Sequence, residues 1–121
     1  MSLPRLADLD GVDGAAVRVP VPDGSLCDLI FIAGREASVD ELREAMVEAA
    51  NGAMKGILRA ANEPLVSSDI IGENHSSIVD LELISQVAPN FFRVVSWYDN
   101  ENSYSVRCVD LLAWMASKDR A

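Results

Sequence analysis

The sequence predicts an α+β domain in which a mostly antiparallel sheet is covered on one face by two main helices. Residues 38–53 and 101–118 carry apolar side chains at the spacing of an amphipathic helix. Several short segments before and between them have the apolar pattern of strands, and loops with proline, glycine or asparagine separate these segments. Strands joined by short loops pair antiparallel, and two helices can pack on one face of such a sheet.

The size and charge of the chain narrow the class of protein. Its 121 residues, of which 50% are hydrophobic, are expected to form a single globular domain over residues 1–121. The net charge of −9 and the lack of a basic stripe argue against nucleic-acid binding. No apolar run is long enough to span a bilayer, and the start of the chain has no secretory-type segment. With only two cysteines as well, we expect a cytoplasmic protein that binds neither nucleic acid nor membranes.

Two strands are expected before the first helix. In residues 15–21 three valines share one side and Arg18 lies on the other, until prolines and turn residues end the strand. Residues 25–33 are apolar at odd and even positions alike, which indicates a strand buried on both faces, or one that meets a partner on one of them. Cys27 in this strand and Cys108 in the last helix are expected to be buried, unreactive thiols.

The first helix is the element with the clearest start. Ser38 and Glu41 form a capping box, in which the Ser38 hydroxyl accepts from the Glu41 amide and the Glu41 carboxylate accepts from the Ser38 amide. Gly52 or Gly56 ends the helix. Further strands are expected at residues 57–61, 76–80, 81–87 and 91–98, with a tight turn segment at 66–72.

The last helix, at 101–118, has a continuous apolar stripe that is expected to face the core. The stripe consists of Val106, Val109, Leu112, Ala113 and Ala116. In the strand before this helix, Trp97 and Tyr98 are expected to be core residues.

Several segments, taken in order, are similar to the glyceraldehyde-3-phosphate dehydrogenase family. Residues 3–6 and 16–22 look like its Leu-Pro-x-Leu and Arg-Val-Pro-x-Pro segments, and residues 54–58 look like its Leu-Lys-Gly-Ile-Leu turn. The similarity continues through residues 66–69, 75–80 and 95–101, and then Tyr104-Ser105. One departure is Asn102-Ser103, where the family often has Trp-Gly. Because the matches run through nearly the whole chain, it resembles the C-terminal part of that family's catalytic domain.

The resemblance also indicates what residues 1–121 lack. Members of the family are glycolytic oxidoreductases that oxidise an aldehyde with NAD or NADP as the acceptor. They use an N-terminal Gly-rich nucleotide-binding domain, a nucleophilic cysteine in Ser-Cys-Thr-Thr-Asn and a downstream histidine, and none of these is present. Neither Cys27 nor Cys108 matches the nucleophile, and His75 does not match the catalytic histidine and is interpreted as a structural loop residue. No catalytic residue and no metal ligand is therefore assigned.

Three residues match binding positions of the family. The resemblance implies that Arg18 helps to bind the substrate phosphate, that Asn100 fixes the nicotinamide carboxamide and that Tyr104 packs near the nicotinamide ring. Each also has a simpler interpretation: a surface arginine on an edge strand, the N-cap of the last helix, and a core aromatic residue. Since the rest of the site is missing, neither NAD nor NADP is expected to bind tightly, and phosphate is expected to bind Arg18 only weakly.

Three hypotheses follow for function. The leading one is a fragment or stand-alone relative of the dehydrogenase that is inactive on its own and keeps half of a site. The alternative is a non-catalytic interaction module that forms a homo-oligomer through its sheet face, because the family's members are tetramers with packed sheets and residues 25–33 are apolar on both faces. The third is a chain that completes another subunit in trans, or a truncated product with no selected role.

Overall fold

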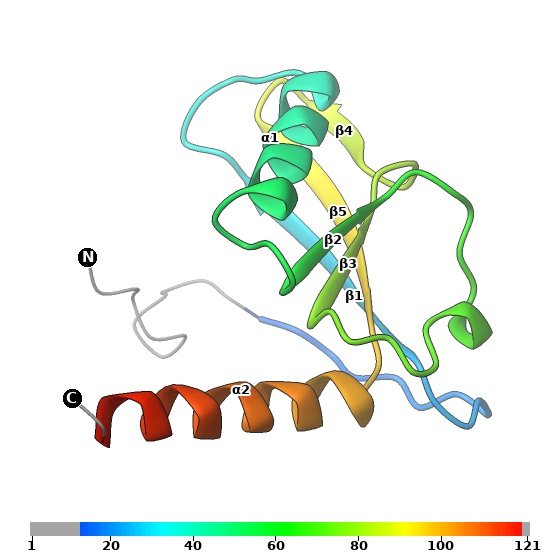
Figure 1. Ribbon diagram of the computed structural model, residues 1–121. Helices are drawn as coiled ribbons and strands as arrows, with labels where there is room; N and C mark the ends of the chain where they lie inside the picture. Colours follow the sequence, from blue (N-terminus) through cyan, green and yellow to red (C-terminus); the bar gives the residue numbers. More distant parts are fainter. Residues whose placement is uncertain (1–12, 120–121) are drawn as a thin grey trace.

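The computed structural model describes residues 13–119, which form a five-stranded sheet, two α-helices and their connections (Figure 1). The fold class is α+β, as the sequence predicted. A 3₁₀ turn, Ser67–Asp69, lies between β2 and β3. The elements are β1 (Ser25–Ile32), α1 (Val39–Asn51), β2 (Leu58–Ala61), β3 (Ser77–Asp80), β4 (Ser85–Ala88), β5 (Phe91–Tyr98) and α2 (Asn102–Asp119).

The sheet is mixed but mostly antiparallel. Its strand order is β1-β5-β3-β2, and β4 pairs with β5 as well. β1 and β5 run antiparallel in an unbroken register, from Ser25 opposite Tyr98 to Ile32 opposite Phe91. β2 and β3 are parallel, because the connection at 62–76 is long enough to carry the chain back to the same end of the sheet, which a short hairpin loop is not.

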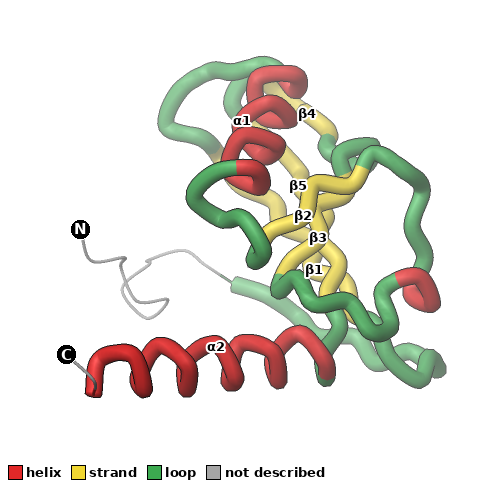
Figure 2. Tube along the Cα trace, in the orientation of Figure 1, coloured by secondary structure: helices red, strands yellow, loops and turns green. Residues whose placement is uncertain are grey.

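Two apolar clusters, one on each face of the sheet, form the core. Ile78 and Val79 are neighbours in β3 but belong to different clusters, because successive side chains of a strand point to opposite faces. Figure 2 shows α1 along one side of the sheet and the β2–β3 connection on the other. The cluster under α1 comprises Leu58, Val79, Leu81, Ile84 and Val94, with Phe31, Leu42 and Met46 packed against it. The cluster under the connection comprises Ala61, Ile70 and Ile78, with Leu65 and Trp97 packed against it.

Two of the strand predictions are wrong in whole or in part. Residues 15–21 form an extended segment with exposed valines and no strand, because no strand among residues 13–119 lies beside them to complete a ladder. Within 81–87 the strand begins only at Ser85. The carboxylate of Asp80 accepts hydrogen bonds from the amides two and three residues further on, and this turn delays the strand.

The apolar residues of β1 and α2 are largely exposed, against expectation. Leu29 is 52% exposed and Ile32 is 73% exposed, and Ser103 is the one buried residue within α2. Figure 1 shows α2 leaving the end of β5 and running along the base of the domain, so α2 does not cover the sheet as α1 does. Cys27 and Cys108 are exposed too, and the prediction of buried thiols is wrong. Periodicity identified the apolar side chains, but nothing within residues 13–119 packs over most of them.

Replacing Ser38 by alanine tests the contribution of the capping box. The Glu41 amide donates to the Ser38 hydroxyl at 3.1 Å, and the Ser38 amide donates to the Glu41 carboxylate at 2.8 Å, as the sequence predicted. We expect Ser38→Ala to lower the free energy of unfolding by about 1 kcal/mol, measured by urea denaturation. Ser105→Ala is the matched control, because the Ser105 hydroxyl donates only to a carbonyl one turn earlier. Equal losses in the two variants would contradict the role of the cap.

Candidate functional site

The start of α2 is fixed by one buried carboxylate. Asp99, which is 1% exposed, directly follows β5. Its side chain accepts hydrogen bonds from the amides of Glu101 and Asn102 at 2.7 Å each and from the amide of Gly72 at 2.8 Å. Burial opposes the ionisation of Asp99, but these backbone donors outweigh it and lower the pKa of the carboxyl. Asp99 therefore caps α2 and joins it to the loop at 70–76.

The departure from the family pattern at 102–103 strengthens the same junction. The side-chain nitrogen of Asn102 donates to the carbonyls of Gly72 and Glu73 at 3.1 Å and 3.0 Å. The hydroxyl of buried Ser103 donates to the Asp99 carbonyl at 2.7 Å. These residues thus hold α2 and the loop together by polar contacts.

Asn100 and Tyr104 line one cavity of about 330 Å³ at this junction. Tyr104 is 73% exposed, so it is not the core residue of the simpler interpretation. Asn100 does not cap α2 with its side chain, because Asp99 does so. The Asn100 side chain instead accepts from the Ser25 hydroxyl at 3.2 Å and donates to a neighbouring carboxylate. The full lining is Ser76, Tyr98, Asp99, Asn100, Ser103, Tyr104 and Arg107.

The residues of this cavity have unmet hydrogen-bonding capacity. Among the described residues, the hydroxyl oxygen of Ser76 and the Nε of Arg107 are buried without a hydrogen-bond partner, and both residues line the cavity. The other guanidinium nitrogens of Arg107 are engaged, with the Gly56 carbonyl at 3.0 Å and the Asp110 carboxylate at 2.9 Å. A buried donor without an acceptor costs about 1–3 kcal/mol. This arrangement suits a site that a ligand or another stretch of polypeptide completes.

Glu73 holds the loop that leads to Ser76. Its carboxylate lies 2.8 Å from Nδ1 of His75 and accepts from the Arg59 guanidinium at 3.1 Å. Burial opposes the ionisation of Glu73, but the hydrogen bonds from His75, Asn74 and Arg59 outweigh it and hold the pKa at about 2. His75 is therefore engaged locally in the loop, which agrees with its interpretation as a structural residue.

Arg18 is not part of this cavity. It lies exposed in the extended segment before β1. That segment is anchored at Gly24, whose φ of 87° favours glycine and whose Cβ, if present, would lie 2.6 Å from the Ser67 carbonyl oxygen. The structure thus brings together two of the three matched residues, Asn100 and Tyr104, and leaves Arg18 apart.

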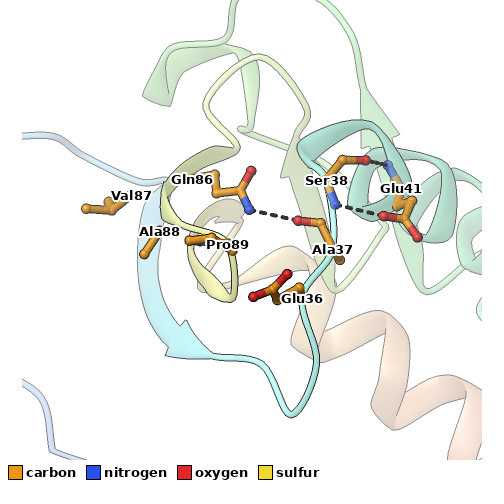
Figure 3. A pocket seen from close by; sticks show the side chains of 8 residues that line it. All are labelled: Glu36, Ala37, Ser38, Glu41, Gln86, Val87, Ala88 and Pro89. Carbon is orange, nitrogen blue, oxygen red and sulfur yellow. Dashed lines mark hydrogen bonds between the residues drawn. The ribbon is translucent and has the colours of Figure 1, made fainter.

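A larger hollow carries none of the matched residues. It is a wide groove of about 640 Å³ between the start of α1 and β4 (Figure 3). Three of its polar side chains, those of Gln86, Ser38 and Glu41, already have partners within the protein. Gln86 donates to the Ala37 carbonyl at 2.7 Å, and Ser38 and Glu41 bond each other in the capping box. We therefore assign no function to this groove.

Residues 13–119 contain no metal-binding cluster, no thiol at the α2 cavity and no helix able to span a membrane. Within residues 13–119, no cluster of three or more His, Cys, Asp or Glu is placed to hold a metal ion. Neither thiol lines the cavity at α2, since Cys27 lies in β1 and Cys108 lies further along α2. None of the helices described combines the length and the apolar character needed to cross a membrane.

Sequence reasoning missed several members of the cavity. The signal for Asp99 was present, because an aspartate just before a helix is a favoured cap. Arg107 follows Tyr104 by three residues and so lies on the same helix face. This spacing was also a usable signal in the sequence. Ser76 had no such signal, because a separate loop brings it to the cavity.

The chain is an α+β domain with a polar cavity at the start of its last helix. The sequence model described as glyceraldehyde 3-phosphate dehydrogenase, C-terminal domain, matches residues 3–100, and the chain belongs to this family. The prediction of that family from the sequence is confirmed.

Individual relatives agree with the family match. The chain is 42% identical over 115 residues to glyceraldehyde-3-phosphate dehydrogenase of Glossina morsitans morsitans, covering 94% of this chain and 34% of the relative. It is 45% identical over 106 residues to glyceraldehyde-3-phosphate dehydrogenase 2 of Schizosaccharomyces pombe, covering 88% and 32%. It is 43% identical over 112 residues to glyceraldehyde-3-phosphate dehydrogenase 1 of Saccharomyces cerevisiae, covering 92% and 34%. The chain thus spans about a third of the length of these relatives.

Acid titration tests the role of Glu73. Its pKa is lower in the folded chain than the ordinary value of 4.5, so the ionised carboxylate stabilises the fold above about pH 4.5, and this stabilisation is lost as the pH falls towards 2. We expect the free energy of unfolding of Glu73→Gln to change less over this range than that of the parent chain, by on the order of 2 kcal/mol. Urea denaturation at a series of pH values measures it.

The matched control for this titration is Glu48→Gln, because Glu48 is exposed on α1. Its pH profile should follow that of the parent chain. If the Glu73→Gln profile did so too, the hydrogen bonds to Glu73 would not be stabilising the loop.

Proposed function

We propose that this chain is a non-catalytic portion of a glyceraldehyde-3-phosphate dehydrogenase, which keeps half of a nicotinamide and substrate site and does not oxidise aldehydes on its own. The observation that supports this most strongly is the cavity at the start of α2. There Asn100 and Tyr104 meet Ser76 and Arg107, whose buried polar atoms lack partners. The site has binding groups, and some of its hydrogen bonds remain to be completed.

The chemistry of aldehyde oxidation explains why this half is insufficient. The reaction needs a thiolate to attack the carbonyl carbon, a base to handle the proton, and a bound nicotinamide to accept hydride. The cavity lining contains no cysteine and no histidine. His75, in the adjoining loop, is engaged by Glu73. The chain can therefore orient a ligand but has no nucleophile placed to react with it.

NAD or NADP would find only part of its site here. The Asn100 side chain would orient the carboxamide, and Tyr104, at 73% exposure, would pack beside the ring. A dinucleotide phosphate usually lies at a Gly-rich loop before a helix, and residues 1–121 contain no such motif. Arg18 would contact the substrate phosphate, but one arginine without convergent donors competes poorly with water. We therefore propose that this chain binds the dinucleotide and the substrate phosphate weakly at most. Its cytoplasmic location stays a prediction.

An activity assay tests the leading proposal. Purified chain is incubated with glyceraldehyde 3-phosphate, phosphate and NAD, and reduced cofactor is followed by its absorbance. We expect no rate above that of buffer, because the nucleophile and base are not at the cavity. A full-length relative assayed in parallel shows that the assay works. Reduced cofactor formed in proportion to the amount of this chain, and abolished by Asn100→Ala, would overturn the proposal.

A second candidate function is self-association through the β1 side of the sheet. The outer face of β1, which we define as Leu26, Asp28, Ile30 and Ile32, points away from the α1 cluster that Phe31 joins. Its three apolar side chains are all exposed. Exposed apolar surface of this kind is typical of an interface between proteins. We propose a homo-oligomer that buries this strand.

Light scattering tests the self-association. We expect the apparent mass of the chain to rise with concentration, because burial of the β1 residues favours association. Leu26→Lys should weaken this rise by placing a charge at the contact. Val87→Lys is the control, since Val87 is also an exposed apolar residue but lies on β4. A mass equal to one chain at every concentration would rule out the oligomer.

A further inference from the structure

The direction of the Asn100 side-chain amide is determined by two neighbouring residues. Its nitrogen Nδ2 donates to the Glu101 carboxylate at 3.3 Å, and its oxygen Oδ1 accepts from the Ser25 hydroxyl at 3.2 Å. An ionised carboxylate can only accept hydrogen bonds, so Nδ2 must lie beside Glu101, and Oδ1 then lies beside Ser25. A hydroxyl can donate or accept, and here it donates. Ser25 and Glu101 thus favour one of the two orientations of the amide plane.

Ser25 makes this contact from an anchored position in the backbone. It is the first residue of β1 and lies opposite Tyr98 of β5, two residues before Asn100. The preceding residue, Gly24, is buried and has no room for a side chain, because the Ser67 carbonyl lies against it. The hydrogen bond between Ser25 and Asn100 joins positions 75 apart in the sequence. Ser25 therefore connects a cavity residue to the start of β1.

The Asn100 amide keeps hydrogen-bonding capacity for a ligand. An asparagine amide has two N–H donors and two acceptor positions, and Asn100 uses one of each on Glu101 and Ser25. Among the described residues, one donor and one acceptor position remain, and Asn100 lines the cavity at the start of α2. A ligand carboxamide carries the same two kinds of group. It can pair with both only while the Asn100 amide is held in one orientation, because donor and acceptor exchange places when the amide turns over.

We propose that Ser25 is a positioning residue for this cavity, which holds the Asn100 amide in the orientation that receives the carboxamide of a nicotinamide ligand. This inference rests on the nicotinamide half-site proposed above and names a residue that fixes its geometry. Ser25 is not one of the residues that line the cavity, so it acts through Asn100 and not by contact with the ligand. A side chain that is ordered before the ligand arrives raises affinity, because less conformational freedom is lost on binding.

NMR relaxation of the Asn100 side-chain amide tests the positioning in the absence of a ligand. In the full chain we expect the order parameter of Nδ2 to exceed about 0.6, the level below which a group is flexible. Ser25→Ala removes the hydroxyl and should lower the order parameter below that level, while those of the backbone at Asn100 and Glu101 stay unchanged. Ser25→Thr keeps a hydroxyl and should keep the amide ordered. Ser117→Ala is the matched control, because the Ser117 hydroxyl donates to a carbonyl within α2.

Titration with nicotinamide mononucleotide tests the effect of Ser25 on binding. The chemical shifts of the cavity residues follow the titration and detect weak binding. We expect Ser25→Ala to raise the dissociation constant about fivefold, because one hydrogen bond no longer holds the amide, and Ser25→Thr to restore the parent value. Ser117→Ala should bind like the parent chain. Urea denaturation of the same variants shows whether each is folded under the conditions of the titration.

The results separate this inference from the proposed half-site. If the parent chain binds the mononucleotide but its Asn100 amide is mobile, or is equally ordered in Ser25→Ala, the positioning role is wrong and the half-site stands. If Ser25 orders the amide but the parent chain binds no mononucleotide, the half-site is wrong and Ser25 only closes the end of β1. A Ser25→Ala chain that is less stable, yet has unchanged amide order and an unchanged dissociation constant, would show that Ser25 is purely structural and would overturn the proposal.

Discussion

The carboxylate of Asp99 connects the sheet, the last helix and the loop before β3. It is buried at the end of β5 and accepts backbone hydrogen bonds from the first residues of α2 and from Gly72. A buried carboxylate is costly unless such donors surround it, so these elements hold one another in place. Asn100 is the next residue along the chain, and Tyr104 lies in the first turns of α2. The positions of both cavity residues therefore depend on this junction.

The surfaces that the domain leaves incomplete are of two kinds. At the cavity, the unmet groups are polar: Ser76 and Arg107 each bury an atom without a partner. Along β1 and α2 the exposed groups are apolar. The unpaired polar atoms need a partner with hydrogen-bonding groups in matching positions. The exposed apolar side chains need only a partner surface of complementary shape, because hydrophobic contact is not directional. The chain belongs to a family whose relatives are about three times its length, and both kinds of surface agree with a domain that works together with other polypeptide.

The features that the sequence predicted well are those decided by neighbouring residues. The capping box at Ser38 and Glu41 needs only residues three apart, and it is present as predicted. The strand predicted at 91–98 matches β5. The valines at 15–21 alternate as in a strand, but a strand also needs a neighbour to pair with, and none is present among the described residues. The prediction that the apolar stripe of α2 faces the core was wrong for a similar reason. The spacing of apolar residues along a helix does not show which element packs against them. The resemblance to the family singled out Asn100 and Tyr104. The contact between Asp99 and Gly72 could not be predicted, because it joins residues far apart in the sequence and has no local signal.

The pairing of β1 with β5 has a consequence for how the chain is made. Asp28 and Arg93, which bond across these strands, are 65 positions apart in the sequence. Because a protein is synthesised from its N-terminus, β1 is made well before β5, the strand that pairs with it. Contacts between such distant positions also form slowly, since a large loop must close first. The pairing of β1 with β5 can therefore form only after residue 98 has been synthesised, and β1 stays without this partner until then.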